Sequence, residues 1–465
     1  SSNTAIGMNA LRDNTTASSN TAVGLNSLLV NTTGSSNTAV GANALDANTT
    51  ASDNTAVGTS ALGANTTGAS NTAIGDDSML SNTTGSNNVA LGAGALASNS
   101  TADKNTAIGR SVLLLNTTGA NNTAVGYFSL DANTTGSRNT SLGAESLSAN
   151  TEGDNNIAVG YQVLQNATTA DNNAGIGYTA LQTCTTGSGN TALGRKALFA
   201  LTTGINNVSV GRNCLVDLTT GTGNVAIGNL AGDTVTTGSK NVLIGATAGD
   251  AVTTGDNNLL FGENAGEQIS SGSRNICIGK DSGTTGSPSG GLTGENDIMC
   301  LGDENITAAH IQVSFTVASD ERDKTDVEPM KMGLDFVNKL EPVTYRWDKR
   351  SKYVENGESI KDVVTDGTHK EDWLDTGFLA QSVEKLESEY GYKVADKTNL
   401  TTKVSKDGEQ YGLSYEKFIP MLVKSIQELS AEVEELKKHS HEPKGLKDMD
   451  GYDELMAEIK NLKGE

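Results

Sequence analysis

The sequence predicts a mostly β repeat solenoid followed by an α+β domain that ends in a long helix. One observation is a repeat: seventeen copies of the pattern Asn-Thr-Ala-Val/Ile-Gly follow one another every 17 residues, from Asn3 to Asn275. The other is a change in charge: residues 1–318 carry 22 acidic and 10 basic side chains, whereas the shorter stretch 319–465 carries 33 and 23. We therefore expect a solenoid shaft over 1–302, a connecting strand within 303–318, a domain over 319–443 and a helical tail over 444–465.

The repeat unit reads approximately N-T-A-V-G-x-x-A-L-x-x-N-T-T-G-x-x and is too short to fold alone, so each copy is expected to form one coil of a solenoid. β-Branched residues alternate before a glycine, which favours a short strand. Each glycine destabilises a helix interior by about 1 kcal/mol relative to alanine, and glycines recur too often here for helices. Asn-Thr-Thr-Gly supplies a turn in which glycine can adopt positive φ. The coils are therefore predicted to be β.

Substitutions between copies suggest which side chains point inward. The residue after the leading asparagine becomes apolar in later copies, as in Val225 and Ile276, and the residue before the glycine is always aliphatic or Phe261. These two positions share one face of a strand, so we expect that face to line the interior and the alanine between them to face outward. Leucine in the ninth place predicts a second inward row, which becomes Ala-Gly-Asp/Glu from Asn224 onward. The leading asparagines are expected to form a hydrogen-bonded ladder along the stack.

Several classes of function are disfavoured by composition. A formal net charge of -22 argues against nucleic acids and acidic membrane surfaces as partners. The four cysteines, Cys184, Cys214, Cys277 and Cys300, show no CxxC spacing, so we expect buried filler rather than a metal site or disulfides. No run approaches the roughly 20 apolar residues of a membrane span, so no membrane insertion is expected. The sequence suggests no cofactor and no metal.

The repeats resemble the shafts of bacteriophage tail fibres and, with a different period, the β-roll heads of trimeric autotransporter adhesins. The resemblance covers about residues 1–302 and implies an elongated homotrimer. After Gly279 the spacing breaks, and a last degenerate coil ends at Leu301-Gly302. Apolar residues then alternate from Ile311 to Val317, which predicts one strand.

The second part resembles the intramolecular chaperone domain of endosialidase-type tail spikes. The resemblance rests on four stretches in the family's order. They are the hexad S-D-E-R-D-K at 319–324, L-D-F-V-N-K-L-E-P-V-T-Y-R-W at 334–347, G-F-L-A-Q-S-V at 377–383 and Y-G-L-S-Y at 411–415.

This resemblance implies that the domain assists assembly of three chains and then cuts itself off between Ala318 and Ser319. Ser319 would be the nucleophile and Lys324 the general base of a serine peptidase that acts once, on its own chain. A serine hydroxyl reacts slowly unless a neighbour removes its proton, and a lysine does so only as the neutral amine. A separation of five residues does not align two side chains on a helix, so the pair needs a turn or another subunit. Asp323 would favour the charged amine and slow cleavage.

The last long helix shows a heptad seam, which we define as Ile419, Leu422, Ile426, Leu429, Val433 and Leu436. Two interpretations are open. The seam can join copies of the chain, or it can pack as an amphipathic face against its own domain.

The sequence thus predicts a structural tail fibre or tail spike that attaches a phage to its host and is part of the virion after assembly in the host cytoplasm. Expected partners are two further copies of the chain, a host receptor of polysaccharide or protein, and other tail or baseplate proteins. The alternatives are a bacterial trimeric surface adhesin and a tail spike that degrades polysaccharide.

Overall fold

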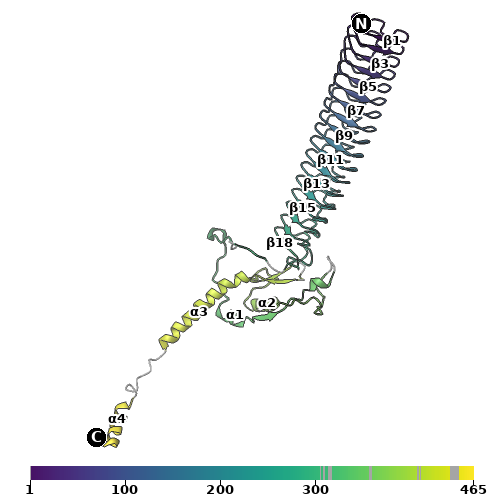
Figure 1. The fold of residues 1–465 in the computed structure, drawn as a ribbon. Coiled ribbons are helices and arrows are strands. Elements are labelled where there is room, and N and C mark those ends of the chain that lie inside the picture. Colours follow the sequence, from purple (N-terminus) through teal and green to yellow (C-terminus); the bar gives the residue numbers. More distant parts are fainter. Residues whose placement is uncertain are drawn as a thin grey trace. The chain divides into compact units, whose positions relative to one another are not determined.

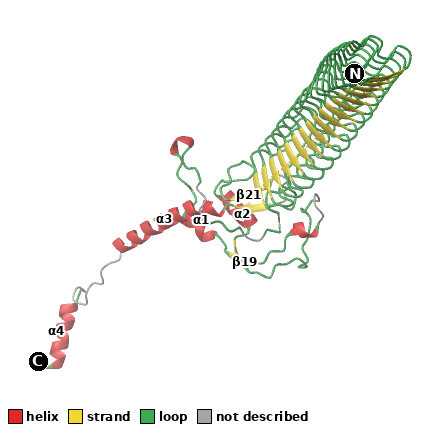
Figure 2. Cartoon of the chain, turned by 45° about the horizontal axis from the view of Figure 1, so that its top comes forward, coloured by secondary structure: helices red, strands yellow, loops and turns green. Residues whose placement is uncertain are grey.

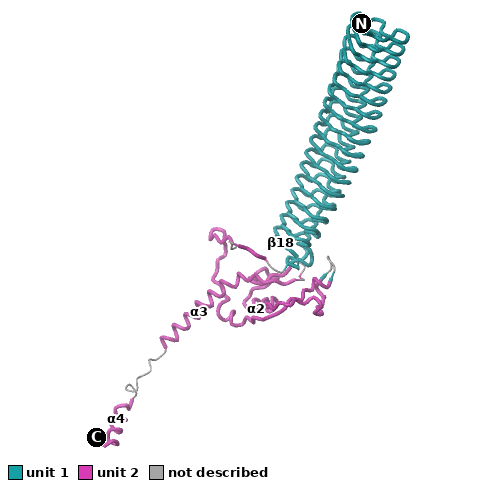
Figure 3. Tube along the Cα trace, in the orientation of Figure 1, with its two compact units in different colours: residues 1–308, 354–359 teal, residues 309–353, 360–465 magenta. Residues whose placement is uncertain are grey.

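A computed structural model describes residues 2–303, 305–306, 309–312, 317–354, 359–405, 408, 410–439 and 450–464. The chain divides into two compact units (Figure 3). Unit 1 comprises residues 1–308 and 354–359, and unit 2 comprises residues 309–353 and 360–465.

Unit 1 is a β-solenoid, as the repeat predicts. One sheet of 18 strands runs along it, and each three-residue strand comes from one coil (Figures 1 and 2). Each strand pairs in parallel with the strands before and after it, so that Thr38 lies beside Thr21 and Thr55. The strands are β1 Thr4–Ile6, β2 Thr21–Val23, β3 Thr38–Val40, β4 Thr55–Val57, β5 Thr72–Ile74, β6 Val89–Leu91, β7 Thr106–Ile108, β8 Thr123–Val125, β9 Thr140–Leu142, β10 Ile157–Val159, β11 Ala174–Ile176, β12 Thr191–Leu193, β13 Val208–Val210, β14 Val225–Ile227, β15 Val242–Ile244, β16 Leu259–Phe261, β17 Ile276–Ile278 and β18 Met299–Leu301.

The last coil has the predicted break in spacing. Ile276 of β17 pairs with Met299 of β18, so 23 residues separate these partners instead of 17. The additional residues follow Gly279 and leave the parallel pairing intact.

The predicted orientation of the strands is wrong. The middle residue of each strand from β2 to β18 is buried, as for Ala22, Ala107 and Ala158, whereas Val40 and Ile74 at strand ends are exposed. The leucine row is inward as predicted and fully buried from Leu28 onward. These leucines fill most of the narrow interior, so the facing strand position accommodates little more than a methyl group. The alanines therefore line the core, and the two apolar columns face outward.

In the coils from Asn224 onward, the leucine row becomes smaller and the middle residue of the strand becomes larger. From Gly232 onward the leucine row becomes glycine, and the middle strand residue grows to Leu243 and Leu260, then to cysteine. A Cβ on Gly249 would lie 2.8 Å from Leu243 Cδ2 and 2.9 Å from Leu260 Cδ1. The strand leucines therefore occupy the space that the other row vacates. All four cysteines are free and buried, as expected of filler, and burial raises the pKa of Cys184 to about 11.

The leading asparagines form the predicted ladder, largely through backbone partners. The Oδ1 of Asn122 accepts a hydrogen bond from the backbone N–H of Asn139 at 2.9 Å, and its Nδ2 donates to Gly136 O at 2.9 Å. A second ladder joins the turn asparagines side chain to side chain, for example Asn48 Nδ2 to Asn31 Oδ1 at 2.8 Å. The ladders satisfy buried polar groups in coils too thin to hold water.

Unit 2 is a small α+β unit with two short antiparallel strand pairs, β19–β20 and β21–β22. The longest helix is α3, as the sequence predicts (Figure 1). The strand expected at Ile311–Val317 lies partly outside the described residues. The elements are the 3-10 turn η1 Glu321–Asp323, α1 Leu334–Lys339, β19 Val343–Tyr345, η2 Arg350–Tyr353, β20 Asp375–Gly377, α2 Ala380–Glu389, β21 Thr402–Val404, β22 Tyr411–Leu413, η3 Tyr415–Lys417, α3 Phe418–His439 and α4 Tyr452–Lys463.

The core of unit 2 joins α1, α2 and the start of α3. Its centre contains Phe336, Val383 and Met421. The fully buried carboxylate of Glu387 on α2 accepts hydrogen bonds from the backbone N–H of Thr401 at 2.6 Å and from its hydroxyl at 2.8 Å. Glu428 on α3 accepts from the backbone N–H of Leu334 at 2.6 Å and so caps α1. Residues nearly a hundred positions apart thus fix this small core.

We predict that Asn122→Ala destabilises the solenoid locally. It leaves the N–H of Asn139 buried without its partner, at about 1–3 kcal/mol, whereas the carbonyl of Gly136 still accepts a hydrogen bond from Asn133 Nδ2 at 2.9 Å. Hydrogen exchange in the coils that contain residues 105–156 should accelerate. Thr118→Ala is the control, because Thr118 is exposed and its side chain is not part of the ladder. Equal protection from hydrogen exchange in both variants would contradict the role of the asparagine ladder in stabilising the coils.

An acidic column makes the stability of unit 1 depend on pH. Asp233, Asp250 and Glu267 occupy the same place in successive coils. Burial, together with the charges of Asp250 and Asp217, raises the pKa of Asp233 from 3.8 to about 6. Between these values the folded chain retains a proton that the unfolded chain has lost, so stability falls as the pH rises through this window.

Asp233→Asn is therefore expected to stabilise its coils at pH 7 and to have little effect at pH 4. The gain should be on the order of 1 kcal/mol, below the roughly 3 kcal/mol of full linkage, because water screens this partly exposed carboxylate. Hydrogen exchange at the two pH values measures it. A destabilisation of equal size at both would refute this account.

Candidate active site

The hexad, the first of the four motifs, folds as a tight turn in unit 2. Asp320 caps the 3-10 turn η1, and its Oδ1 accepts a hydrogen bond from the backbone N–H of Arg322 at 3.0 Å. The backbone N–H of Lys324 donates to Glu321 O at 3.1 Å, after which the chain is extended. This single turn reverses the chain between Ser319 and Lys324.

The turn brings the two predicted site residues into contact. Lys324 Nζ lies 2.6 Å from Ser319 Oγ, within hydrogen-bond distance. A local turn therefore spans the five-residue separation, and no second subunit is needed to form this contact. Both side chains are exposed, as is Ala318 on the other side of the predicted cleavage bond. An exposed acyl group beside Ser319 can be reached by water.

Two charges of the hexad pair with each other. Arg322 Nη2 lies 2.6 Å from Asp320 Oδ2, and this contact lowers the pKa of the Asp320 carboxyl and raises that of the Arg322 guanidinium. Within the described residues, Lys324 forms no ion pair with Asp323. The expected slowing of cleavage by Asp323 remains a prediction.

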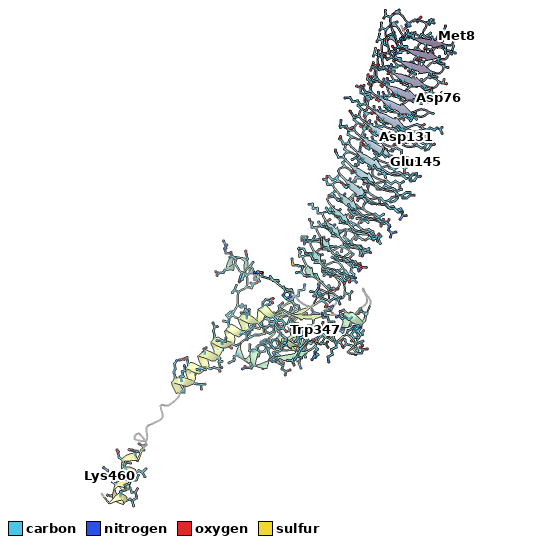
Figure 4. All side chains as sticks on the ribbon, in the orientation of Figure 1. Met8, Asp76, Asp131, Glu145, Trp347 and Lys460 are labelled. Carbon is cyan, nitrogen blue, oxygen red and sulfur yellow. The ribbon has the colours of Figure 1, made fainter. Side chains whose placement is uncertain are left out.

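The downstream motifs meet in the core of unit 2. The backbone N–H of Phe378 donates to the hydroxyl of Tyr415 at 3.1 Å, and the Phe378 ring stacks on Phe418 with 5.4 Å between centroids. Tyr345 packs edge to face on Trp347 at 5.2 Å, and Figure 4 labels the partly exposed Trp347. Stretches recognised separately in the sequence therefore meet in one core, to which they contribute Phe336, Val383 and, at its edge, Leu413.

The heptad seam of α3 does not pack on unit 2. The buried residues of this helix are Phe418, Met421 and Ser425, which lie on another face. The seam residues are all exposed, with Ile426 at 63% and Leu436 at 69%. The interpretation in which the seam packs against its own domain is therefore wrong, because Phe418, Met421 and Ser425 supply the contact of α3 with its unit.

The solenoid carries a further cluster around two tyrosines that the sequence indicates to be exposed but whose stacking it did not predict. The exposed rings of Tyr161 and Tyr178 stack with 5.7 Å between centroids and an interplanar angle of 21°. Gln162 and Gln182 lie in the same two coils. Gln162 donates to Glu145 of the preceding coil at 2.7 Å, and Gln182 donates to Gln162 at 2.9 Å. Figure 4 labels Glu145 on unit 1. The repeat period could have revealed the cluster, because stacked coils place residues 17 apart side by side.

Other kinds of site were also sought. Among the described residues, no group of three or more histidine, cysteine, aspartate or glutamate side chains could hold a metal ion. Within that same part of the chain, every helix is too short or too polar to cross a membrane.

Comparison with known proteins gives one match. The family model described as the chaperone of endosialidase matches residues 319–392, and the match begins at Ser319. Searches of curated proteins and of solved structures each found no significant match. The C-terminal part of the chain therefore contains a segment of the endosialidase-chaperone type, preceded by a 17-residue-repeat β-solenoid. The Tyr411–Tyr415 stretch lies beyond the matched residues but packs with them.

Proposed function

We propose that the chain is a phage tail fibre or tail spike subunit that assembles as a homotrimer with the help of unit 2 and attaches the virion to its host. The match to the chaperone of endosialidase carries this proposal. The exposed heptad seam on α3 supports association between copies, because an apolar stripe of this length is seldom left in water. Attachment and a place in the virion follow from the resemblance of the repeats to fibre shafts.

Self-cleavage between Ala318 and Ser319 is the second part of the proposal. The neutral amine of Lys324 takes the proton of the Ser319 hydroxyl, and Oγ attacks the carbonyl carbon of Ala318. The C–N bond breaks as the Ser319 nitrogen gains a proton, which leaves an ester between Ala318 and Oγ. Water then hydrolyses the ester to the Ala318 carboxylate and the free Ser319 hydroxyl. The 2.6 Å contact between Oγ and Nζ supports the first step.

Host attachment through carbohydrate has specific support. Exposed stacked rings offer an apolar platform for the C–H faces of sugars, and neighbouring amides and a carboxylate can bind hydroxyl groups. The Tyr161–Tyr178 cluster combines these features on one part of unit 1. It supports binding of polysaccharide and does not by itself distinguish a fibre from a degrading spike.

The cleavage proposal predicts that the freshly expressed chain is cut once, and that Ser319→Ala or Lys324→Ala leaves it intact. Lys324→Arg should also block cleavage, because arginine keeps the charge but does not release its proton. Intact mass and N-terminal sequencing, which should start at Ser319, measure the result. Lys331→Ala, at another exposed lysine, should be cut normally.

Uncut variants should still assemble, since cleavage follows assembly in this scheme. A wild-type chain that stays full-length refutes the peptidase and leaves the chaperone role standing. A wild-type chain that is monomeric refutes the chaperone role.

The attachment proposal predicts that the double variant Tyr161→Ala, Tyr178→Ala loses binding to an array of bacterial surface polysaccharides. Its oligomeric state should not change. Leu25→Ala removes an exposed apolar side chain from the same place in another coil and should bind normally. Equal binding by the wild type and the double variant would exclude the tyrosines.

A further inference from the structure

The outer face of the solenoid sheet carries no charge along its length, and one of its two columns is apolar in every coil. We call this surface the apolar strip; it consists of the first and third residues of strands β1–β18. The third residue is aliphatic in every strand except β16, where it is Phe261. No position of the strip carries a charge, and many are exposed, among them Ile74 at 37%, Phe261 at 51% and Leu301 at 57%.

A neighbouring column of the solenoid does carry charges. Two residues beyond the end of each strand lies a column that contains Asp76, Arg110, Arg195 and Glu263. Charged side chains are therefore accepted next to the strip but not on it. Figure 4 labels Asp76 in this neighbouring column.

The composition of the later strands indicates that the strip is covered. Strands of parallel sheets that are buried on both faces are continuous apolar runs, and Val-Leu-Ile of β15 and Leu-Leu-Phe of β16 have that composition. Here the inner face is covered by the leucine row, whereas the outer face is left exposed by the described residues of unit 1. An exposed apolar surface of this extent marks an interaction site.

The period of the strip identifies its occupant. Any partner that lies along 18 strands must present apolar groups at the spacing of the coils. A second copy of this chain has that spacing, and homo-oligomers place identical surfaces in symmetric contact. We infer that the apolar strip is the surface along which copies of unit 1 lie side by side in the homotrimer. This inference rests on the proposed trimer and adds the contact surface within the shaft.

The strip also becomes more apolar towards its C-terminal end. The first residue of the strand is threonine in most coils up to β12, and from Val208 of β13 to Met299 of β18 it is always apolar. Apolar area removed from water contributes roughly 25 cal/mol per Å². The last six coils therefore contribute more to association per coil than the first.

Cysteine cross-linking in the full chain tests the inference directly. Ile74 lies on the strip and Asp76 lies beside it in the same coil, and both are exposed. The native cysteines are buried and should not react quickly. With a short bis-maleimide, the Ile74→Cys variant should give a covalent dimer on denaturing gels. The Asp76→Cys variant, the control, should give no such band. Comparable bands from both, or none from Ile74→Cys in a trimeric protein, overturn the inference.

A charge on the strip provides the energetic test. Ile227→Lys should shift sedimentation of the full chain towards smaller species, because the lysine would be buried between copies. Ala246→Lys, in the charge-bearing column, should leave the trimer unchanged. Hydrogen exchange of coils 224–257 would verify that both variants fold.

The two proposals fail in different ways. The wild type and the Ile227→Lys variant could both be trimeric, with no cross-link at residue 74. That result would refute only the inference about the apolar strip. In that case the strip faces a different protein or the host, and unit 2 alone holds the copies together. A monomeric wild type would refute the proposed trimer as well.

Discussion

The structure of unit 1 depends on the parallel stacking of coils of equal length. Each asparagine of the ladder accepts from the backbone of the next coil and donates to a turn carbonyl, as Asn122 does with Asn139 and Gly136. One inserted residue would move a buried amide away from both partners and expose the alanine row. The period therefore persists over seventeen copies because every coil uses the same hydrogen bonds. The only extra residues come after Gly279, where they form a loop outside the paired strands.

The same stacking produces the surfaces on which function is proposed. Because equivalent residues lie directly above one another, any preference repeated in the sequence becomes a continuous column. The alanine column becomes the core, the flanking columns become the apolar strip, and two tyrosines at one place become a stacked pair. Unit 2 has no such repetition, and long-range contacts such as Glu428 with Leu334 hold its few short elements together.

In unit 2 the proposed chemistry and the proposed assembly use different parts. Ser319 and Lys324 meet through the local turn η1, which makes no use of the packed core. The heptad seam lies on α3, whose first turn is in that core. A turn at the surface can be cut without loss of the packing between α1, α2 and α3. This separation fits a domain that first supports assembly and afterwards detaches.

The sequence by itself determined the period, the β-solenoid and the break after Gly279, because each is encoded in consecutive residues or in their spacing. The Ser319–Lys324 pair was expected only from the resemblance of the hexad and the motifs after it to endosialidase-type chaperones. Tertiary structure decided which strand face is inside, because an alternation of period two is the same for either face. Sequence reasoning placed the most apolar columns inside, and the core instead has the smaller alanines, since the leucine row already fills it. Only the fold showed that η1 closes the five-residue gap, because the residue types of the hexad do not by themselves fix this turn. Only the fold showed that Phe418 and Met421, rather than the seam, pack α3 on its unit, because this packing depends on residues far apart in the sequence.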